Sequence, residues 1–97
     1  MLKKGNKMPR RIRRKIRGRF HHNCFKPCGM KMNEIETEIL NEAEIEAIRL
    51  ADFEGLYQEE AANQMEVSRP TFSRILNSAR KKIANALLNG RAIEIQI

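Results

Sequence analysis

Two amphipathic stretches between residues 58 and 89 form the clearest pattern along the chain. The first, residues 58–65 (QEEAANQM), contains no Gly, Pro or β-branched residue and therefore predicts a short helix. The second, residues 69–89, has apolar side chains at intervals of three and four, which predicts a helix of about 30 Å with one apolar face. We expect that face to consist of Phe72, Ile75, Leu76, Ala79, Ile83, Ala86 and Leu87.

The residues between these two helices have the features of a tight turn. Ser68 is a favourable N-cap for the second helix, and Pro70 is tolerated in its first turn. Glu66 occupies the position where such turns usually have a glycine in the left-handed conformation. That conformation costs any residue other than glycine about 1 to 2 kcal/mol. The pattern predicts a helix-turn-helix, although an ordinary helical hairpin would look similar. The contacts buried between the helices are expected to be Ala62, Met65, Val67, Phe72 and Ile75.

Another helix and two strands flank this unit. Asn41 and Glu44 form a capping-box sequence, so we expect a helix that begins after Asn41 and ends near Gly55. Polar and apolar residues alternate over residues 34–39 and 93–97, which predicts short strands that pair with each other, with the N-terminal segment or with a second subunit. The expected fold is mainly α, a helix-turn-helix of three to four helices with short flanking β-strands and a basic N-terminal arm. The buried side of the additional helix is expected to be Ile45, Ala47, Ile48, Leu50 and Ala51.

Charge is segregated along the 97 residues, which is more informative than the net charge of +7. Residues 1–33 contain 12 Lys and Arg and no acid, whereas residues 34–66 contain 11 acids and one Arg. Residues 67–97 contain six basic residues and one acid. Such blocks indicate an arm that faces a polyanion, an acidic scaffold and a basic recognition element. We therefore divide the chain into a basic N-terminal arm with a His/Cys cluster, residues 1–33, and a helix-turn-helix domain with flanking strands, residues 34–97.

His21, His22, Cys24 and Cys28 form the one cluster in the sequence with metal-ligand chemistry. Two thiols and one or two imidazoles can bind zinc. The Cys-x3-Cys spacing is less usual than Cys-x2-Cys, however, and incidental thiols are the favoured alternative. The sequence contains neither an apolar run of membrane-spanning length nor a signal peptide. We therefore expect a cytoplasmic protein with reduced thiols and no membrane partner.

Three segments resemble the helix-turn-helix in the fourth region of bacterial sigma factors: LADFEGLYQEEAA (residues 50–62), VSR (67–69) and RILNSARKK (74–82). They are more similar still to a family of small prokaryotic proteins, domain-of-unknown-function family 134, described as predicted DNA-binding proteins. The similarity extends to MPR (8–10), FKP (25–27) and GRA (90–92), and covers roughly residues 8–95. Glu66 and Pro70 depart from the family pattern, which has glycine in the turn and often a polar residue in the second helix. The resemblance implies DNA binding and specifies no operator, effector or target.

We expect a sequence-specific, double-stranded DNA-binding regulator of transcription, with the second helix of the motif in the major groove. Arg69, Ser73, Arg74 and Asn77 are expected to reach base edges, beside Pro70 on the same outer face. Phosphate contacts are expected from Thr71, Lys81 and the arm residues Arg10, Arg11, Arg13 and Arg14.

A homodimer is expected because paired helix-turn-helix units read two half-sites. Two other classes remain open, a metal- or redox-sensing DNA-binding module and a structured-RNA-binding protein. Catalysis is not expected, since the sequence has no phosphate-cradling glycine loop and no nucleophile motif. The expected joining surfaces of the dimer are Ile35 with Ile39, and Ile93 with Ile95 and Ile97.

Overall fold

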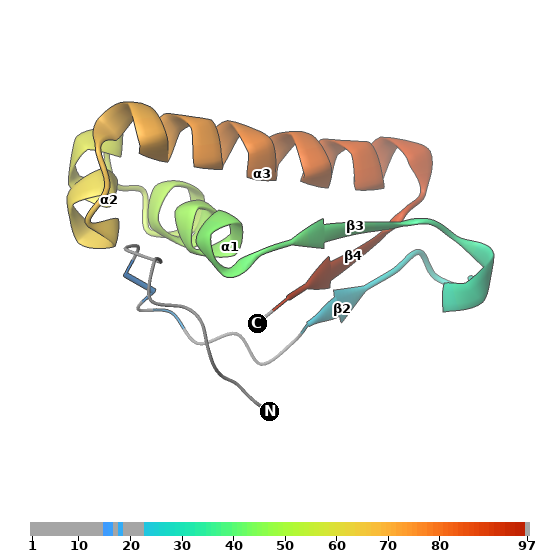
Figure 1. The fold of residues 1–97 in the computed structure, drawn as a ribbon. Helices are drawn as coiled ribbons and strands as arrows, with labels where there is room; N and C mark the ends of the chain where they lie inside the picture. Colours follow the sequence, from blue (N-terminus) through green and yellow to red (C-terminus); the bar gives the residue numbers. More distant parts are fainter. Residues whose placement is uncertain (1–14, 17, 19–22, 97) are drawn as a thin grey trace.

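The long helix α3 (Arg69–Asn89) runs across the molecule, and the other elements lie along one side of it (Figure 1). The computed structural model describes residues 15, 16, 18 and 23–96. Helices α1 and α2 lie under the first half of α3, and a small sheet lies under the second half. The expectation of a mainly α fold with short flanking strands is therefore confirmed. In chain order, the elements before α3 are β2 (Cys24–Phe25), a 3-10 turn (Met32–Glu34), β3 (Thr37–Leu40), α1 (Glu42–Ile48), a π-helical turn (Arg49–Phe53) and α2 (Gln58–Met65), and β4 (Ala92–Ile95) follows it.

The core lies where α1, α2 and the first half of α3 meet. Phe72 and Leu76 on α3 are fully buried and pack in one cluster with Met65 on α2 and Leu50. Ala61 and Ala62 on α2 are also buried, and alanine at these positions lets α3 cross α2 closely. The expected contacts between the two helices are confirmed, with Val67 and Ile75 packed against the same cluster. Within the described part of the chain, no helix combines the length and apolar character needed to cross a membrane.

The helix ends follow the expected capping chemistry. Glu66 ends α2 in the left-handed conformation, with φ 59° and ψ 44°. The Ser68 hydroxyl accepts a hydrogen bond of 3.2 Å from an amide in the first turn of α3, and Gly90 ends that helix with φ 68°. At α1 the capping box is complete, because the Glu44 amide donates to the Asn41 side chain at 2.8 Å and the Asn41 amide donates to the Glu44 carboxylate at 3.0 Å.

The sheet joins segments that are far apart in the sequence. Its strand order is β2-β4-β3, with β4 antiparallel to β2 and parallel to β3 (Figure 1). Two of the three strand pairings that the sequence left open therefore occur. The strand near the end of the chain pairs with the strand before α1 and also with the N-terminal segment.

The expected bounds of the strand over residues 34–39 were wrong, because it begins at Thr37 and residues 32–34 form a 3-10 turn. The side chain of Glu38 faces α3, and its carboxylate accepts hydrogen bonds from Asn85 on that helix and from Arg91 just after it. Ile39 consequently lies on the other side of the strand and is 43% exposed. Donors far along the sequence decide which face of the strand points inward. The alternation of polar and apolar residues within the strand contains no information about these donors.

Two further expectations about burial were wrong. Leu87, expected on the apolar face of α3, is 75% exposed. Ile95 is only 7% exposed, so it packs inside its own subunit instead of forming an outer joining surface. The helix that begins after Asn41 ends in the π-helical turn, in which the Glu54 amide donates to the Arg49 carbonyl at 2.8 Å.

Candidate nucleic-acid interface

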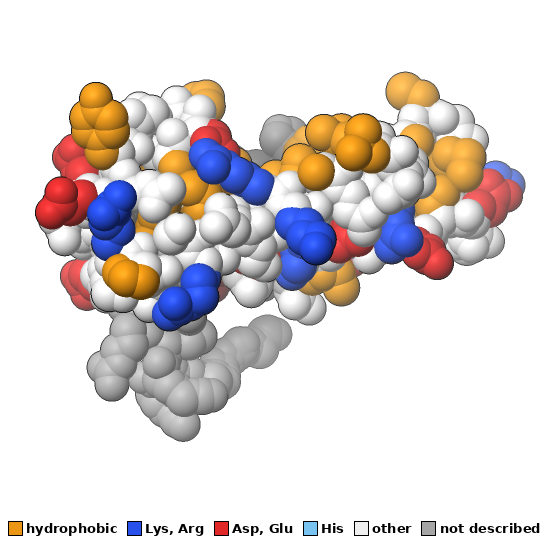
Figure 2. Space-filling view, turned by 90° about the horizontal axis from the view of Figure 1, so that it is seen from above, with side chains coloured by type: hydrophobic (Ala, Val, Ile, Leu, Met, Phe, Trp, Pro, Cys, Tyr) orange, Lys and Arg blue, Asp and Glu red, His pale blue; other side chains and the backbone are white. Residues whose placement is uncertain are grey.

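The face of α3 opposite the core is formed by Pro70, Arg74, Asn77 and Lys81. All four are exposed, and at 3.6 residues per turn they fall within an arc of about 60°. Figure 2, which looks down on α3, shows basic side chains spaced along this face and apolar ones gathered over its second half. All seven residues of α3 that the sequence predicted as contacts therefore lie at the surface. Arg69, Pro70, Arg74, Asn77 and Lys81 are exposed, and Thr71 and Ser73 are half-buried.

The cations of α3 fall into two groups that differ in their partners. Arg80 forms an ion pair of 2.5 Å with Asp52, and Lys82 forms one of 3.0 Å with Glu44. Arg69, Arg74 and Lys81 form no ion pair with any residue that the structure describes. The basic side chains that face the body are thus neutralised, and those on the outer face keep their positive charge for a ligand.

Geometry explains why Arg80 belongs to the first group. Its guanidinium donates two hydrogen bonds to the Asp52 carboxylate, at 3.2 and 2.5 Å, in the fork arrangement that suits a carboxylate. These hydrogen bonds hold the pKa of Arg80 above its ordinary value. Asp52 lies in the π-helical turn after α1, so the pair also ties that turn to the middle of α3.

A shallow groove of about 420 Å³ lies between the first turns of α2 and α3. Gln58, Arg69, Pro70 and Ser73 line it. Gln58 was not among the predicted contacts, because its position in the sequence only marks the start of a helix. Its neighbourhood with Arg69 depends on how α2 and α3 cross, which sequence spacing alone does not specify.

A larger cavity of about 630 Å³ lies on the other flank of α3, between that helix and the start of α1. Thr71 and Arg74 line it together with Asn41, Glu44 and Ser78. The predicted contacts are therefore not a single cluster. Arg69 and Ser73 lie on one flank of the outer face, and Thr71 lies on the other.

The predicted arm contacts Arg10, Arg11, Arg13 and Arg14 lie outside the described residues. Lys15, the next residue, is described, and its ammonium group lies 3.5 Å from the Glu66 carboxylate. The described end of the arm thus meets the turn between α2 and α3.

Two of the four predicted zinc ligands, His21 and His22, also lie outside the described residues. Cys24 and Cys28 are exposed free thiols, and the described residues contain no group of three potential metal ligands. The Cys24 thiol lies 3.7 Å from the Met32 sulfur. Zinc binding by the four residues therefore stays a prediction.

Comparison with known proteins identifies relatives of the chain. Residues 1–96 match the family profile described as "Protein of unknown function DUF134". A UPF0251 protein of Thermoanaerobacter sp. (strain X514) is 58% identical over 72 residues, which cover 74% of this chain and 64% of that protein. A UPF0251 protein of Vibrio parahaemolyticus is 47% identical over 83 residues, 86% of each chain.

A UPF0251 protein of Moorella thermoacetica is 57% identical over 72 residues, which cover 74% of this chain and 48% of the relative. The chain thus spans less than two thirds of the length of the Thermoanaerobacter and Moorella relatives. No solved structure gives a significant match.

Proposed function

The chain belongs to the family described as "Protein of unknown function DUF134", as its sequence resemblance predicted, and we propose that it binds double-stranded DNA sequence-specifically and regulates transcription. In this proposal α2, the turn and α3 form a helix-turn-helix, and α3 enters the major groove. Neither the family description nor the names of the relatives state an activity. The proposal therefore depends on the chemistry of α3.

The observation that carries the proposal is the contrast between the paired and unpaired cations of α3. Arg69, Arg74 and Lys81 face outward without a carboxylate from the described residues. A surface that serves only for solubility mixes both signs of charge. Phosphates of a DNA duplex would supply the missing anions, and release of their counterions would contribute free energy of binding.

The outer face also contains side chains suited to reading bases. Arg74 can donate two hydrogen bonds to guanine, and Asn77, one turn later, can form two with adenine. Lys81 lies about 10 Å further along the helix axis than Arg74, where the groove gives way to the phosphate backbone. The Thr71 hydroxyl accepts a hydrogen bond of 2.9 Å from Ser68, so its own hydrogen remains for a phosphate oxygen.

The proposal includes a homodimer in the cytoplasm, where the DNA of a prokaryote lies. Two helix-turn-helix units would read two half-sites about one helical turn apart. Leu87 and Leu88 near the end of α3 are 75% and 83% exposed, and they offer apolar surface to a second copy. This surface replaces the joining surface through Ile95.

Selection of bound sequences from random duplex DNA at a stated salt concentration tests the proposal. The protein should enrich a common sequence and bind it more tightly than scrambled DNA. Enrichment should be lost in the double variant Arg74→Ala, Lys81→Ala. The matched control is Lys26→Ala, Lys31→Ala, which removes the same charge near the far end of the sheet and should retain enrichment.

Two results would contradict the proposal. The selection would recover no common sequence if α3 does not read bases. Tighter binding to structured RNA than to duplex DNA at equal salt would favour the RNA-binding alternative.

A further inference from the structure

Besides the pairing of β2 with β4, the described residues 15, 16 and 18 of the basic arm contact the helical part of the protein in two places. At the first, the Lys15 amide donates a hydrogen bond of 2.9 Å to the Met65 carbonyl at the end of α2. Its side chain pairs with Glu66 in the turn that follows. Ile16 packs against the core cluster formed by residues such as Phe72 and Leu50. The arm segment thus contributes both a backbone bond and apolar contact.

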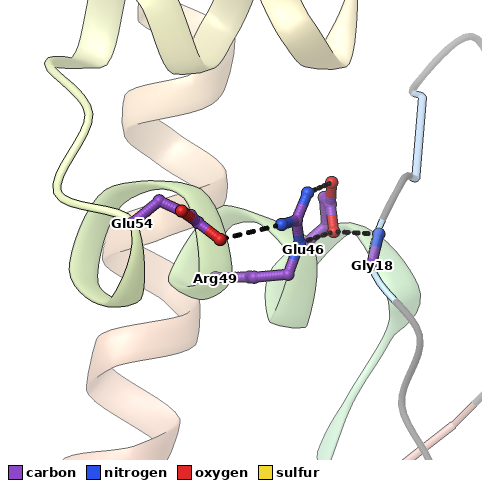
Figure 3. Close-up of polar contacts among 4 residues, drawn as sticks. All are labelled: Gly18, Glu46, Arg49 and Glu54. Atoms are coloured by element: carbon purple, nitrogen blue, oxygen red, sulfur yellow. Dashed lines mark hydrogen bonds and ion pairs between the residues drawn. The ribbon is translucent and has the colours of Figure 1, made fainter.

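The second point is a buried carboxylate. The Gly18 amide donates a hydrogen bond of 3.2 Å to Glu46 Oε1 on α1 (Figure 3). Glu46 is 0% exposed, and Arg49 binds it with two hydrogen bonds, Nε to Oε1 at 2.9 Å and Nη2 to Oε2 at 2.8 Å. Glu54 lies 3.4 Å from the other terminal nitrogen of Arg49. The acceptor that meets Gly18 is therefore held in place by Arg49, which Glu54 in turn orients.

Burial makes this contact specific. An ionised carboxylate is costly to remove from water unless its charge is paired and its oxygens accept hydrogen bonds. Arg49 supplies the charge and two of the donors, and the Gly18 amide supplies another. The arm is thus an integral partner of the Glu46–Arg49 pair, and losing it would expose one side of that pair to water.

We propose that the Glu46–Arg49 pair anchors the basic arm beside the turn between α2 and α3, so that the arm and α3 contact the same DNA duplex. This inference rests on the proposed function. Lys15 is fixed to Met65, three residues before the N-cap of α3. Since one residue spans at most about 3.6 Å, the backbone from Arg10 to Arg14 can extend no further than about 18 Å from Lys15.

That reach covers the phosphates on either side of a major groove about 12 Å wide. Anchoring raises the effective concentration of the arm at those phosphates and reduces the conformational freedom lost on binding. Glu46 and Gly18 act in this scheme as positioning residues, because neither of them touches DNA.

The pair Gly18→Pro and Gly18→Ala tests the anchor without changing the body. Proline lacks the N–H that donates to Glu46, whereas alanine retains it. Limited trypsin digestion of the free protein should cleave after Lys15 faster in Gly18→Pro than in Gly18→Ala or the natural chain. Circular dichroism establishes that both variants keep their helices. Equal cleavage rates would overturn the anchor.

Titrations with the selected duplex then test its consequence. Gly18→Pro should weaken binding on the order of tenfold in the full chain. It should have little effect when Arg10, Arg11, Arg13 and Arg14 are all replaced by Gln, because the released arm then carries few phosphate contacts. An equal loss of affinity in both backgrounds would reduce the Gly18–Glu46 bond to a fold contact and overturn the inference. Failure of the natural chain to bind any duplex would instead reject the proposed function, and the anchoring role toward DNA with it.

Discussion

The carboxylate of Glu44 on α1 accepts a hydrogen bond of 2.6 Å from the hydroxyl of Ser78 on α3, 34 residues further along the chain. The same carboxylate accepts 3.0 Å hydrogen bonds from Lys82 and from the Asn41 amide. Lys82 also donates to the Ile39 carbonyl of β3 at 2.8 Å. One nearly buried acid therefore joins the start of α1 to α3 and, through Lys82, to the sheet.

Stability should fall in acid through Glu44. Burial alone raises the pKa of this carboxyl, but the hydrogen bonds from Ser78, Asn41 and Lys82 together with the Lys82 charge outweigh it and hold the pKa below its ordinary value of 4.5. A group whose pKa is lowered by folding contributes stability above its unfolded pKa, and this is lost as the pH falls through the folded pKa. Glu44→Gln should cost roughly 1 to 3 kcal/mol at pH 7.

Urea denaturation from pH 7 to pH 3 measures how the contribution of Glu44 to stability depends on pH. The difference in free energy of unfolding between the natural chain and Glu44→Gln should be constant at neutral pH. It should shrink as the pH falls below about 4.5. A difference that stays constant into acid would show that Glu44 contributes through packing alone.

Arg74→Ala should separate base reading from phosphate binding. We expect a cost in binding free energy of roughly 1 to 3 kcal/mol on the selected site and much less on random DNA, since Arg74 lies at the centre of the outer face. Replacing Arg10, Arg11, Arg13 and Arg14 should instead weaken binding to both duplexes alike. It should also reduce the slope of log affinity against log salt by about 0.9 for each phosphate that the arm no longer binds. Arg80→Ala is the control on the same helix, because Asp52 already neutralises Arg80. An equal effect of Arg74→Ala on both duplexes would mean that α3 does not read bases.

Glu66→Gly should stabilise the protein by about 1 kcal/mol. Glycine adopts the left-handed conformation without the steric cost that Glu66 bears, although it loses more backbone entropy on folding. The ion pair with Lys15 is exposed and contributes little. Glu66→Ala removes the same charge and keeps the strain, so it should not stabilise. Urea denaturation measures the free energies of unfolding of both variants. Equal values for Glu66→Gly and Glu66→Ala would show that the turn is not strained.

Phe72→Ala and Leu87→Ala should differ sharply although both lie on one predicted apolar face. Phe72 is fully buried, so its truncation should cost about 3 to 5 kcal/mol. Leu87 is mostly exposed, and its truncation should change the stability of the single subunit by less than about 0.5 kcal/mol. Thermal and urea unfolding of both variants test this, and a large effect at Leu87 in the monomer would contradict the placement of its side chain.

The proposed dimer has a direct measurement. Light scattering of the natural chain at tens of micromolar should give about twice the chain mass of 11.3 kDa. Leu87→Ser combined with Leu88→Ser should return it to the single-chain mass with the helices intact. A single-chain mass for the natural protein, both free and bound to DNA, would reject the dimer.

The α2–α3 region was predictable because its signals are local. The Ser68 cap, the left-handed Glu66 and Gly90 each act within a few residues, and the apolar period of α3 needs only the helix itself. The surface position of the predicted contacts follows from the same period. The helical period does not predict which of the cations on α3 remain unpaired, because Asp52, which pairs with Arg80, lies 28 residues away in the sequence.

Buried acids were the main feature that the sequence did not predict. Glu44 and Glu46 follow a run of alternating acids that is typical of a solvated surface, yet they are 5% and 0% exposed. Donors far along the chain contribute to their burial, Ser78 for Glu44 and Gly18 for Glu46, the latter beside the local donor Arg49. The strand that begins at Thr37 was misplaced for the same reason, because its inward face is set by Asn85 on α3 and Arg91 just after that helix.

The position of β4 between β2 and β3 has a consequence for synthesis of the protein. A ribosome releases β2 and β3 first, and both keep their backbone donors and acceptors unpaired until residues 92–95 have emerged. The α1–α3 core, whose segments adjoin in sequence, can fold before that moment. The strand released last therefore closes the sheet from its middle, and a chain stalled at the end of α3 would present two unpaired strands beside a finished helical core.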